Sequence, residues 1–333
     1  MNPPHSGFHG TGIRGGQRFF EGWFYRISLP ACCQSFALMH SIDDPQGGTA
    51  YAGGMIQVLG MGDRPAWRTL PNVHTFYADP NSLDYGHTGS RGTFYHVQGD
   101  RHWGCLHDPV QSFHCQWDFR VTPIHTWGQN QATMGLLSYL PIFEPGWQIL
   151  MAHGWANGWL RWQEQHFDLI HAPAYAEKNW GRSFPERWFW IQCNAFPDRP
   201  NLSITAAGGV RSHLGRTSLV AMVSLHNGSE VLSFAPSNSQ IYCHVQPWGT
   251  WHLAAFSPTH SLELWGETSN PGGRLLVPTA EGLRFLGRET GTGTLRITWD
   301  DGKTYYSAAS SLAALEVGGR GWEEPWQFTS ARF

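Results

Sequence analysis

Short runs of alternating apolar and polar residues recur along the chain, and clusters of Gly, Pro, Asn and Asp separate them. Alternation with a period of two is typical of β-strands that bury one face. No long segment shows the apolar period of an amphipathic helix. Two hairpins are predicted at 224–230 and 297–306, because an Asn-Gly pair and an Asp-Gly pair within them tolerate the positive φ of tight turns. The chain is therefore predicted to be mainly β, with its strands arranged in barrels or sandwiches.

The length of 333 residues favours two domains, since a single hydrophobic core stops growing efficiently beyond about 250–300 residues. A weak internal repeat supports this, because an aromatic strand, a turn and a second apolar strand occur at 22–40 and again at 187–206. Two similar β domains explain the repeat, although the common composition of hairpins explains it equally well. The least patterned connection lies near 181–186. We therefore expect an N-terminal β domain over 1–182 and a C-terminal β domain over 183–333.

Charged residues make up only 14% of the chain, against about 25% in an average soluble domain. Aromatic residues also reach 14% and include 18 Trp, which favours an aromatic-lined interior, a lipid-facing surface, or both. The formal net charge of −3 and the lack of a basic run argue against nucleic acid as a partner. No uncharged apolar run approaches 18 residues, so any contact with a membrane is expected to be peripheral.

The cysteines and histidines lack the spacing of a metal site. The six cysteines form no C-x-x-C pair, so they are expected to be reduced and mostly buried, in a cytosolic setting. The histidines from His96 to His114 lack the i, i+4 arrangement of a zinc enzyme, and no metal is predicted. Residues 1–16 lack the charged and apolar regions of a signal peptide.

The segment 175–194 places a carboxyl group, Glu177, and an amine, Lys178, among large aromatic side chains. Strand alternation puts Tyr175, Glu177 and Asn179 on one face and Lys178 on the other. If the first face lines a pocket, a hydroxyl, a carboxyl and an amide converge there while Lys178 points away. The alternative is an ordinary ion pair between Glu177 and Lys178 or a nearby Arg, which stabilises a protein little.

Six longer blocks of the sequence resemble those of the tocopherol cyclases, the enzymes that form the chromanol ring of vitamin E in cyanobacteria and plant plastids. The blocks keep the order of that family, and they occupy residues 19–26, 141–148, 154–162, 174–181, 188–194 and 318–322. The resemblance implies two lipocalin-like antiparallel β-barrel domains packed together. Because no transit peptide is evident, the chain is more similar to the cyanobacterial form than to the plastid form.

The resemblance also implies a reaction and a substrate. A phytyl-bearing methylated benzoquinol adds its phenolic oxygen across the nearest trisubstituted double bond of its tail. No electron is transferred, so no cofactor is expected, and the lack of a dinucleotide-binding glycine motif agrees with this. We expect a tocopherol cyclase in the cytoplasm, peripheral to the thylakoid or plasma membrane, with no obligate protein partner.

Ring closure needs an acid that holds a proton near neutral pH, and burial in apolar surroundings raises the pKa of a carboxyl group in this way. Glu177 is the first candidate, together with the polar residues that share its face, mainly because of the resemblance. Glu21 is the closest rival. A structural role for Glu21, in an ion pair with Arg18 or Arg26, is an equally good interpretation.

Three further polar residues lie beside aromatic or apolar segments. Asp43 ends an apolar strand and is a minor candidate for the acid, although its neighbours Asp44 and Pro45 favour a solvated turn. His40 is a candidate proton relay, because imidazole titrates near neutrality. Glu144 precedes a proline and is expected to fix a loop.

Aromatic faces are expected to enclose the prenyl tail and to steady the positive charge that develops on it. Each aromatic residue taken singly is more often part of a core than of a ligand site. The substrate-binding candidates are Trp23, Phe24, Trp180, Trp188 and Trp190. The Trp-rich segment 146–162 either lines the cavity or forms an exposed patch that takes substrate from a bilayer.

Two other functions remain open. A noncatalytic lipocalin-like carrier of a terpenoid or another lipid needs the cavity but no buried acid. A carotenoid hydratase-like enzyme also begins by protonating an alkene, and it then lets water attack in place of a phenol. The position of the acid relative to the cavity distinguishes the carrier from the enzymes.

Overall fold

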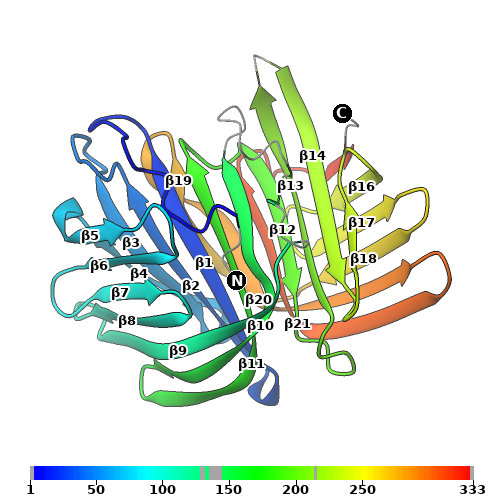
Figure 1. The fold of residues 1–333 in the computed structure, drawn as a ribbon, viewed down its shortest axis with the longest axis horizontal. Helices are drawn as coiled ribbons and strands as arrows, with labels where there is room; N and C mark the ends of the chain where they lie inside the picture. Colours follow the sequence, from blue (N-terminus) through cyan, green and yellow to red (C-terminus); the bar gives the residue numbers. More distant parts are fainter. Residues whose placement is uncertain (1–3, 128–131, 134, 136–144, 214–215, 331–333) are drawn as a thin grey trace. The chain divides into compact units, whose positions relative to one another are not determined.

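The computed structural model describes residues 4–127, 132–133, 135, 145–213 and 216–330. Within these ranges the regular structure consists of strands β1 to β22 and short 3-10 turns (Figure 1). The turns are η1 (Pro30–Cys32), η2 (Met61–Asp63) and η3 (Val73–Thr75). None of the helices in the described ranges has the length and apolar character needed to cross a bilayer. The predicted mainly β fold is confirmed.

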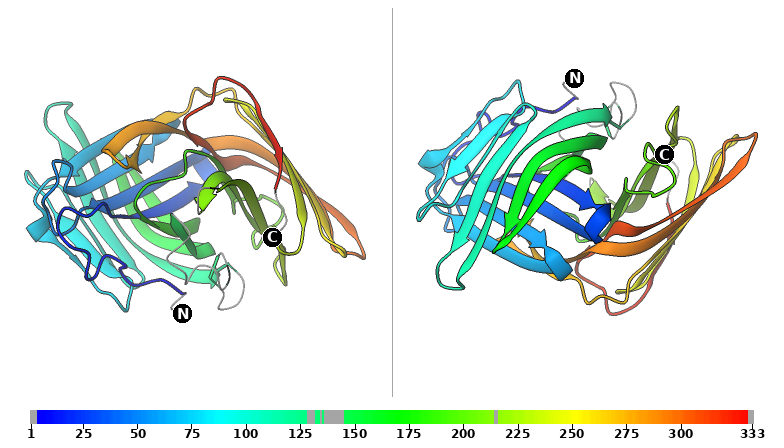
Figure 2. Two further views of the ribbon diagram at one scale, coloured as in Figure 1. Left: turned by 90° about the horizontal axis from the view of Figure 1, so that it is seen from above. Right: turned by 90° about the horizontal axis from the view of Figure 1, so that it is seen from below.

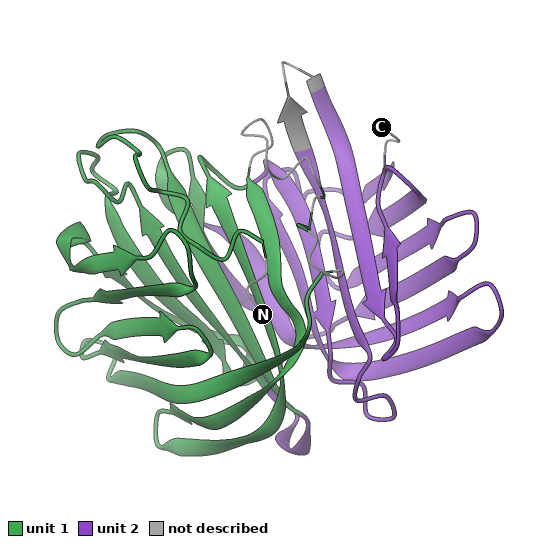
Figure 3. Ribbon diagram, viewed as in Figure 1, with its two compact units in different colours: residues 1–29, 35–184, 276–284 green, residues 30–34, 185–275, 285–333 purple. Residues whose placement is uncertain are grey.

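The chain divides into two compact units (Figure 3). Unit 1 comprises residues 1–29, 35–184 and 276–284, and unit 2 comprises residues 30–34, 185–275 and 285–333. The main change of unit, after Phe184, is close to the expected boundary. Two short segments cross this division. Residues 30–34 follow β1 of unit 1 but belong to unit 2, and residues 276–284 follow a part of unit 2 but belong to unit 1. The composition of the sequence does not indicate either exchange. The division into domains over 1–182 and 183–333 stays a prediction.

Unit 1 is built on one antiparallel sheet with the strand order β4-β3-β2-β1-β11-β10-β9-β8-β7-β6-β5. Its strands are β1 (Phe20–Leu29), β2 (Gln34–Asp43), β3 (Gly53–Gly60), β4 (Arg64–Leu70), β5 (Phe76–Ala78), β6 (Asp84–Thr88), β7 (Phe94–Gln98), β8 (Arg101–Asp108), β9 (Phe113–His125), β10 (Gly146–Trp162) and β11 (Gln165–Gly181). The sheet curls strongly (Figure 2), and Arg68 Nη1 on β4 comes within 3.4 Å of Asp108 Oδ1 on β8. This curvature is what the predicted barrel requires.

Side chains alternate between the two faces of this sheet. On one face, called the core face below, apolar residues such as Trp23 and Ala174 form the hydrophobic core of unit 1. The other face, called the reverse face, carries polar side chains that are buried as well, among them Arg26 and Gln57. Gln57 accepts a hydrogen bond of 3.0 Å from the backbone of Leu276. A sheet face in contact with water would leave such polar side chains exposed. Because they are buried here, this part of the reverse face is a buried polar surface.

Unit 2 is built on a second antiparallel sheet with the order β15-β14-β13-β12-β21-β20-β18-β17-β16-β22, while β19 pairs with β20. Its strands are β12 (Arg187–Cys193), β13 (Ser203–His213), β14 (Arg216–His226), β15 (Val231–Phe234), β16 (Gln240–Val245), β17 (Thr250–Phe256), β18 (Ser261–Glu267), β19 (Gly273–Thr279), β20 (Gly282–Asp300), β21 (Tyr305–Gly319) and β22 (Trp326–Thr329). Both predicted hairpins are confirmed, because Asn227 N donates to Glu230 O at 3.1 Å and Asp301 N donates to Thr304 O at 3.3 Å.

Candidate active site

Glu177 lies on β11 together with Tyr175 and Asn179, as strand alternation predicts. The Tyr175 hydroxyl donates a hydrogen bond of 2.6 Å to Glu177 Oε2, and Asn179 Nδ2 lies 3.4 Å from Oε1. Trp147 Nε1 on the neighbouring strand β10 donates to Oε2 at 2.9 Å. Hydrogen bonds donated to a carboxyl group stabilise its ionised form. These contacts therefore suit a proton acceptor better than a proton donor.

This cluster lies on the reverse face of the sheet and not on the core face. Ala174 and Ala176, which alternate with Tyr175 and Glu177 along β11, belong to the core of unit 1. Lys178 continues their row and is fully buried. Lys178 thus lies on the face opposite Glu177, as alternation predicts, but this is the core face of the sheet, which becomes charged near the end of β11.

Lys178 pairs with Glu21 on β1, and both side chains are completely buried. Lys178 Nζ also donates to Gly7 O at 2.7 Å, and Glu21 Oε2 accepts from the backbone N–H of His9 at 2.8 Å. The structure therefore contradicts the alternative ion pair of Glu177 with Lys178. The alternative partners considered for Glu21, Arg18 and Arg26, are also replaced by Lys178, which the antiparallel pairing of β1 with β11 brings alongside.

The charges around Glu21 decide its protonation. Burial raises the pKa of the Glu21 carboxyl most strongly, but Lys178 and His9 together outweigh it, so the pKa is lowered overall. Burial lowers the pKa of Lys178, and Glu21 opposes that change. Glu21 is thus ionised near neutral pH and cannot donate a proton there. It holds the N-terminal segment against β1 and β11.

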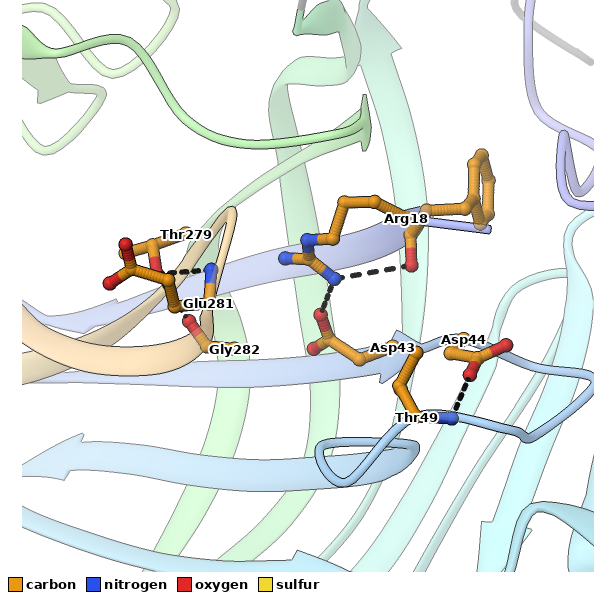
Figure 4. A network of polar contacts seen from close by, with 8 residues as sticks. Arg18, Asp43, Asp44, Thr49, Thr279, Glu281 and Gly282 are labelled. Carbon is orange, nitrogen blue, oxygen red and sulfur yellow. Dashed lines mark hydrogen bonds and ion pairs between the residues drawn. The ribbon is translucent and has the colours of Figure 1, made fainter. Parts of the chain in front are cut away.

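Asp43 lies at the end of β2, with only 1% of its side chain exposed (Figure 4). Arg18 Nη1 donates a hydrogen bond to Asp43 Oδ1. Asp43 Oδ2 is buried and has no hydrogen-bond partner in the described part of the chain. The adjacent Asp44 is also buried, and it accepts from the backbone of Gly16 at 3.3 Å and of Thr49 at 2.8 Å. The expected solvated turn is therefore wrong, since this pair of acids is enclosed.

Burial raises the pKa of the Asp43 carboxyl to about 6. Arg18 opposes this effect, and the neighbouring charge of Asp44 adds to it. A carboxyl with this pKa holds its proton on about a tenth of the molecules at pH 7 and on about half of them at pH 6. Asp43 therefore has the protonation that alkene protonation requires, which Glu21 lacks.

Aromatic rings flank the Arg18–Asp43 pair. The Arg18 guanidinium lies 5.0 Å from the ring centroid of Tyr51 and 5.9 Å from that of Phe20. Phe20 in turn stacks on Phe184, with 5.5 Å between the ring centroids. The pair thus lies in aromatic surroundings on the reverse face.

Asp43 and Glu177 share the reverse face but lie far apart. Asp44 N donates to Phe19 O, which places Asp43 beside Phe20 on β1, whereas Glu177 is opposite Phe24. Their Cα positions are thus separated by two strand spacings and four residues along β1, or about 16 Å. Their side chains are therefore not neighbours on the sheet.

His40 belongs to the core face and not to the surface that carries Asp43. Its Nδ1 lies 3.3 Å from the Tyr85 hydroxyl, and its ring stacks on Tyr95 with 4.2 Å between centroids. Burial first, and then the charge of His102, holds the pKa of His40 well below its ordinary value. The structure thus gives a neutral core histidine and does not bring the expected relay next to Asp43.

The expected substrate-binding residues lie on different surfaces. Trp23 stacks on Tyr85 at 3.9 Å in the core of unit 1, and Phe24 packs on the reverse face against Tyr175. Trp180 stacks on His9 at 4.0 Å. In unit 2, Trp188 Nε1 donates to Glu316 Oε1 at 3.0 Å, and Trp190 is buried on the same strand.

The Trp-rich segment 146–162 forms strand β10, whose first half is buried. Glu144, expected to fix a loop, lies outside the described residues. The clearest omission from the sequence-based site is Arg18, which was considered only as a partner of Glu21. Counting residues back from the turn within 22–40 indicates that Arg18 lies near Asp43, because β1 and β2 are neighbouring strands that this turn joins into a hairpin.

Comparison with known proteins identifies the family. The sequence model described as "Tocopherol cyclase-like" matches residues 17–319. The chain belongs to this family. A relative from Oryza sativa subsp. japonica, designated a probable chloroplastic tocopherol cyclase, is 31% identical over 99% of this chain and 81% of its own. The chloroplastic tocopherol cyclase of Zea mays is 32% identical over 99% of this chain and 80% of its own. The resemblance found in the sequence blocks is confirmed.

Two solved structures of distant sequence share the fold of this family member. A Nitrosomonas europaea protein named as AttH superposes with a TM-score of 0.53 at 12% identity, over 96% of this chain and 99% of its own. Kievitone hydratase from Nectria haematococca gives a TM-score of 0.52 at 11% identity, over 97% and 92% of the two chains. At this identity the likeness concerns the fold alone, and it agrees with the predicted β architecture.

Proposed function

We propose that the protein is a tocopherol cyclase that closes the chromanol ring of a phytyl-bearing benzoquinol, and that Asp43 is the proton donor. The family assignment supports the reaction, since the relatives named tocopherol cyclases align with almost the whole chain. The observation that carries the assignment of the acid is the buried Asp43 carboxyl, whose Oδ2 has no partner in the described ranges. A proton held there is available to a substrate.

The reaction is an isomerisation in which one acid can serve twice. Asp43 Oδ2 gives its proton to the less substituted alkene carbon, and the π electron pair forms the new C–H bond. The phenolic oxygen then attacks the tertiary carbon, so that a C–O bond forms and the O–H bond breaks. The released proton returns to the Asp43 carboxylate, which restores the acid. No electrons are gained or lost.

The surroundings of Asp43 fit this chemistry. Arg18 stabilises the carboxylate that exists between the two proton transfers, since an opposite charge favours the ionised form. The face of an aromatic ring such as Phe20 or Tyr51 stabilises a nearby cation by about 0.5–2 kcal/mol. Among the described residues no group forms a hydrogen bond with Oδ2, so this oxygen can carry the proton that is transferred.

This assignment changes the first choice of acid from Glu177 to Asp43. Glu177 accepts hydrogen bonds from Tyr175 and Trp147, which makes it the poorer donor. Glu21 is ion-paired with Lys178. Asp43 differs from both in combining burial, a pKa raised to about 6 and an oxygen with no partner among the described residues.

The apolar tail of the substrate indicates where in the cell the enzyme meets it. A phytyl chain is insoluble in water, so the prenylated quinol is expected to reach the enzyme from a lipid bilayer. We therefore extend the proposal to a cyanobacterial-type enzyme that contacts the thylakoid or plasma membrane peripherally, acts without a cofactor and needs no partner protein.

The test is conversion of a phytyl benzoquinol by the purified protein in detergent under reducing conditions, with no cofactor added. We expect a single chromanol enantiomer, and Asp43→Asn should lower kcat at least about 100-fold, the usual contribution of a general acid. Circular dichroism and the unfolding midpoint control for loss of fold. Tail binding without any conversion by the wild type would indicate a carrier instead, and addition of water to the tail would indicate a hydratase.

A further inference from the structure

The Arg18 guanidinium has one nitrogen that forms hydrogen bonds, Nη1, and one edge, formed by Nε and Nη2, that forms none with the described residues. This second edge is called the open edge below. Arg18 Nη1 donates to both Asp43 Oδ1 and the backbone oxygen of Phe19, the latter at 3.4 Å. Its Nε and Nη2 are buried, yet neither has a hydrogen-bond partner among the described residues. Only 12% of the side chain is exposed, so solvent access is small. A guanidinium in this state has lost water without gaining a replacement for it.

No acid in the described part of unit 1 is placed to close this open edge. Asp44 already accepts the backbone N–H groups of Gly16 and Thr49. Glu281, in the turn after β19, is exposed, and Figure 4 shows its carboxyl group turned away from the Arg18 guanidinium. The open edge, next to Asp43, therefore has no hydrogen-bond acceptor among the described residues.

The chemistry of the open edge defines the group that it binds. Guanidinium N–H groups only donate, and their planar fork suits an oxygen with two lone pairs. Asp43 Oδ2, the neighbouring atom, has no hydrogen-bond partner among the described residues and can exchange a proton with such a group. The rings of Tyr51 and Phe20 beside the guanidinium favour an aromatic ligand. A hydroxyl group on an aromatic ring meets all of these conditions.

We propose that Arg18 binds the phenolic oxygen of the quinol headgroup through Nε and Nη2 and thereby positions the tail alkene at Asp43. This inference rests on the proposed function and deepens it, because it assigns the recognition of the headgroup to a residue that neither gives nor accepts a proton. During ring closure the phenolic O–H bond breaks, its proton passes to Asp43, and the oxygen lone pair forms the C–O bond. Arg18 keeps all its protons throughout.

The test compares two ligands that cannot react, because their tails are saturated. One ligand is the phytanyl hydroquinone. The other is the aromatic hydrocarbon that has the same ring and tail but no hydroxyl groups. Tryptophan fluorescence measures the binding of each. We expect the wild type to prefer the hydroquinone about 10- to 100-fold, as hydrogen bonds to a charged group imply, and Arg18→Met to lose that preference while binding the hydrocarbon unchanged.

Two further variants separate recognition from structure. Asp43→Asn should keep the preference for the hydroquinone although it loses turnover, because the open edge of Arg18 remains. Arg120→Met removes an arginine from an exposed ion pair with Asp100 and should leave both affinities unchanged. Arg18→Lys should retain only part of the preference, since an ammonium group lacks the planar fork.

The inference is overturned if Arg18→Met weakens the binding of both ligands equally, because that result shows a purely structural role. It is also overturned if the variant keeps the full preference for the hydroquinone. Failure of the wild type to form a chromanol from the unsaturated quinol would remove the proposed function and leave the ligand preference measurable. The two failures are therefore distinguishable.

Discussion

The ammonium group of Lys178 and the carboxyl group of Glu21 form an ion pair in which both side chains have no exposed surface. The pair joins β11 to β1, and its remaining hydrogen bonds hold the backbone of the N-terminal segment at Gly7 and His9. A buried pair of this kind stabilises a fold little in total, but removing one member leaves an uncompensated charge in the interior.

We expect Lys178→Met and Glu21→Gln each to lower the free energy of unfolding by about 3–5 kcal/mol, and the double variant to lose clearly less than the sum. Urea unfolding followed by fluorescence measures all three. Arg120→Met in the exposed pair with Asp100 is the matched control and should cost under about 1 kcal/mol. Strictly additive losses would show that the two side chains are not coupled.

The pH dependence of activity should report Asp43. The acid form is the active one, and burial raises its pKa to about 6. We therefore expect kcat/KM to be level below pH 6 and to fall tenfold per pH unit above it. Arg18 lowers the pKa of this carboxyl, so Arg18→Met should move the inflection to higher pH. A profile that rises with pH would assign an ionised group to the rate-limiting step and contradict Asp43 as the donor.

The same shift predicts a change of stability with pH. The Asp43 pKa is about 6 in the folded protein against 3.8 ordinarily, so the folded state binds this proton more tightly than the unfolded state. Stability from this group is therefore present at low pH and is lost between about pH 4 and pH 6, by about 3 kcal/mol. The measurable quantity is the difference in unfolding free energy between the wild type and Asp43→Asn. A difference that does not vary over this range would refute the shift.

Glu177 provides the contrasting case. Replacing it by Gln weakens the hydrogen bonds that Tyr175 and Trp147 donate to Glu177 Oε2, which should cost about 1–3 kcal/mol of stability. Because the Cα positions of Asp43 and Glu177 are about 16 Å apart, turnover should stay within about tenfold of the wild type when measured below the unfolding temperature. Loss of turnover in Glu177→Gln, together with an active Asp43→Asn, would transfer the role of the acid to Glu177.

Local sequence patterns correctly predicted those features that depend on neighbouring residues, namely turns and the alternation of side chains along a strand. The hairpin turns at Asn227 and Asp301 follow from the need for positive φ, and alternation correctly grouped Tyr175 with Glu177. Alternation cannot tell which face of a strand forms the core, because that depends on the whole sheet. Lys178 shows the difficulty, since a charged residue continues a row of core alanines once Glu21 neutralises it.

The site itself depended on pairing between strands. Asp43 looked like part of a solvated turn, because its sequence neighbours are Asp44 and Pro45. Its burial arises from contacts that the local sequence does not contain, namely the hydrogen bond from Arg18 and the enclosure of the reverse face. The raised pKa of Asp43 follows from that burial. The local sequence therefore could not identify Asp43 as the strongest candidate for the acid.

Gly282 offers a test of the aromatic support beside Arg18. This glycine opens β20 with φ +94°, and a Cβ atom on it would lie 2.8 Å from Tyr51 Cβ. Gly282→Ala must therefore both adopt a strained backbone and displace Tyr51, on which the Arg18 guanidinium lies.

We expect Gly282→Ala to lower stability by about 1–3 kcal/mol and kcat/KM by more than that loss of folded protein explains. Gly302→Ala is the matched control, because Gly302 has φ +84° and a Cβ there would lie 2.8 Å from Thr259 O, in the β20–β21 hairpin of unit 2. It should show a similar loss of stability with unchanged kcat/KM at a temperature where both variants are folded. Equal activity losses in the two variants would mean that Tyr51 does not support Arg18 during the reaction.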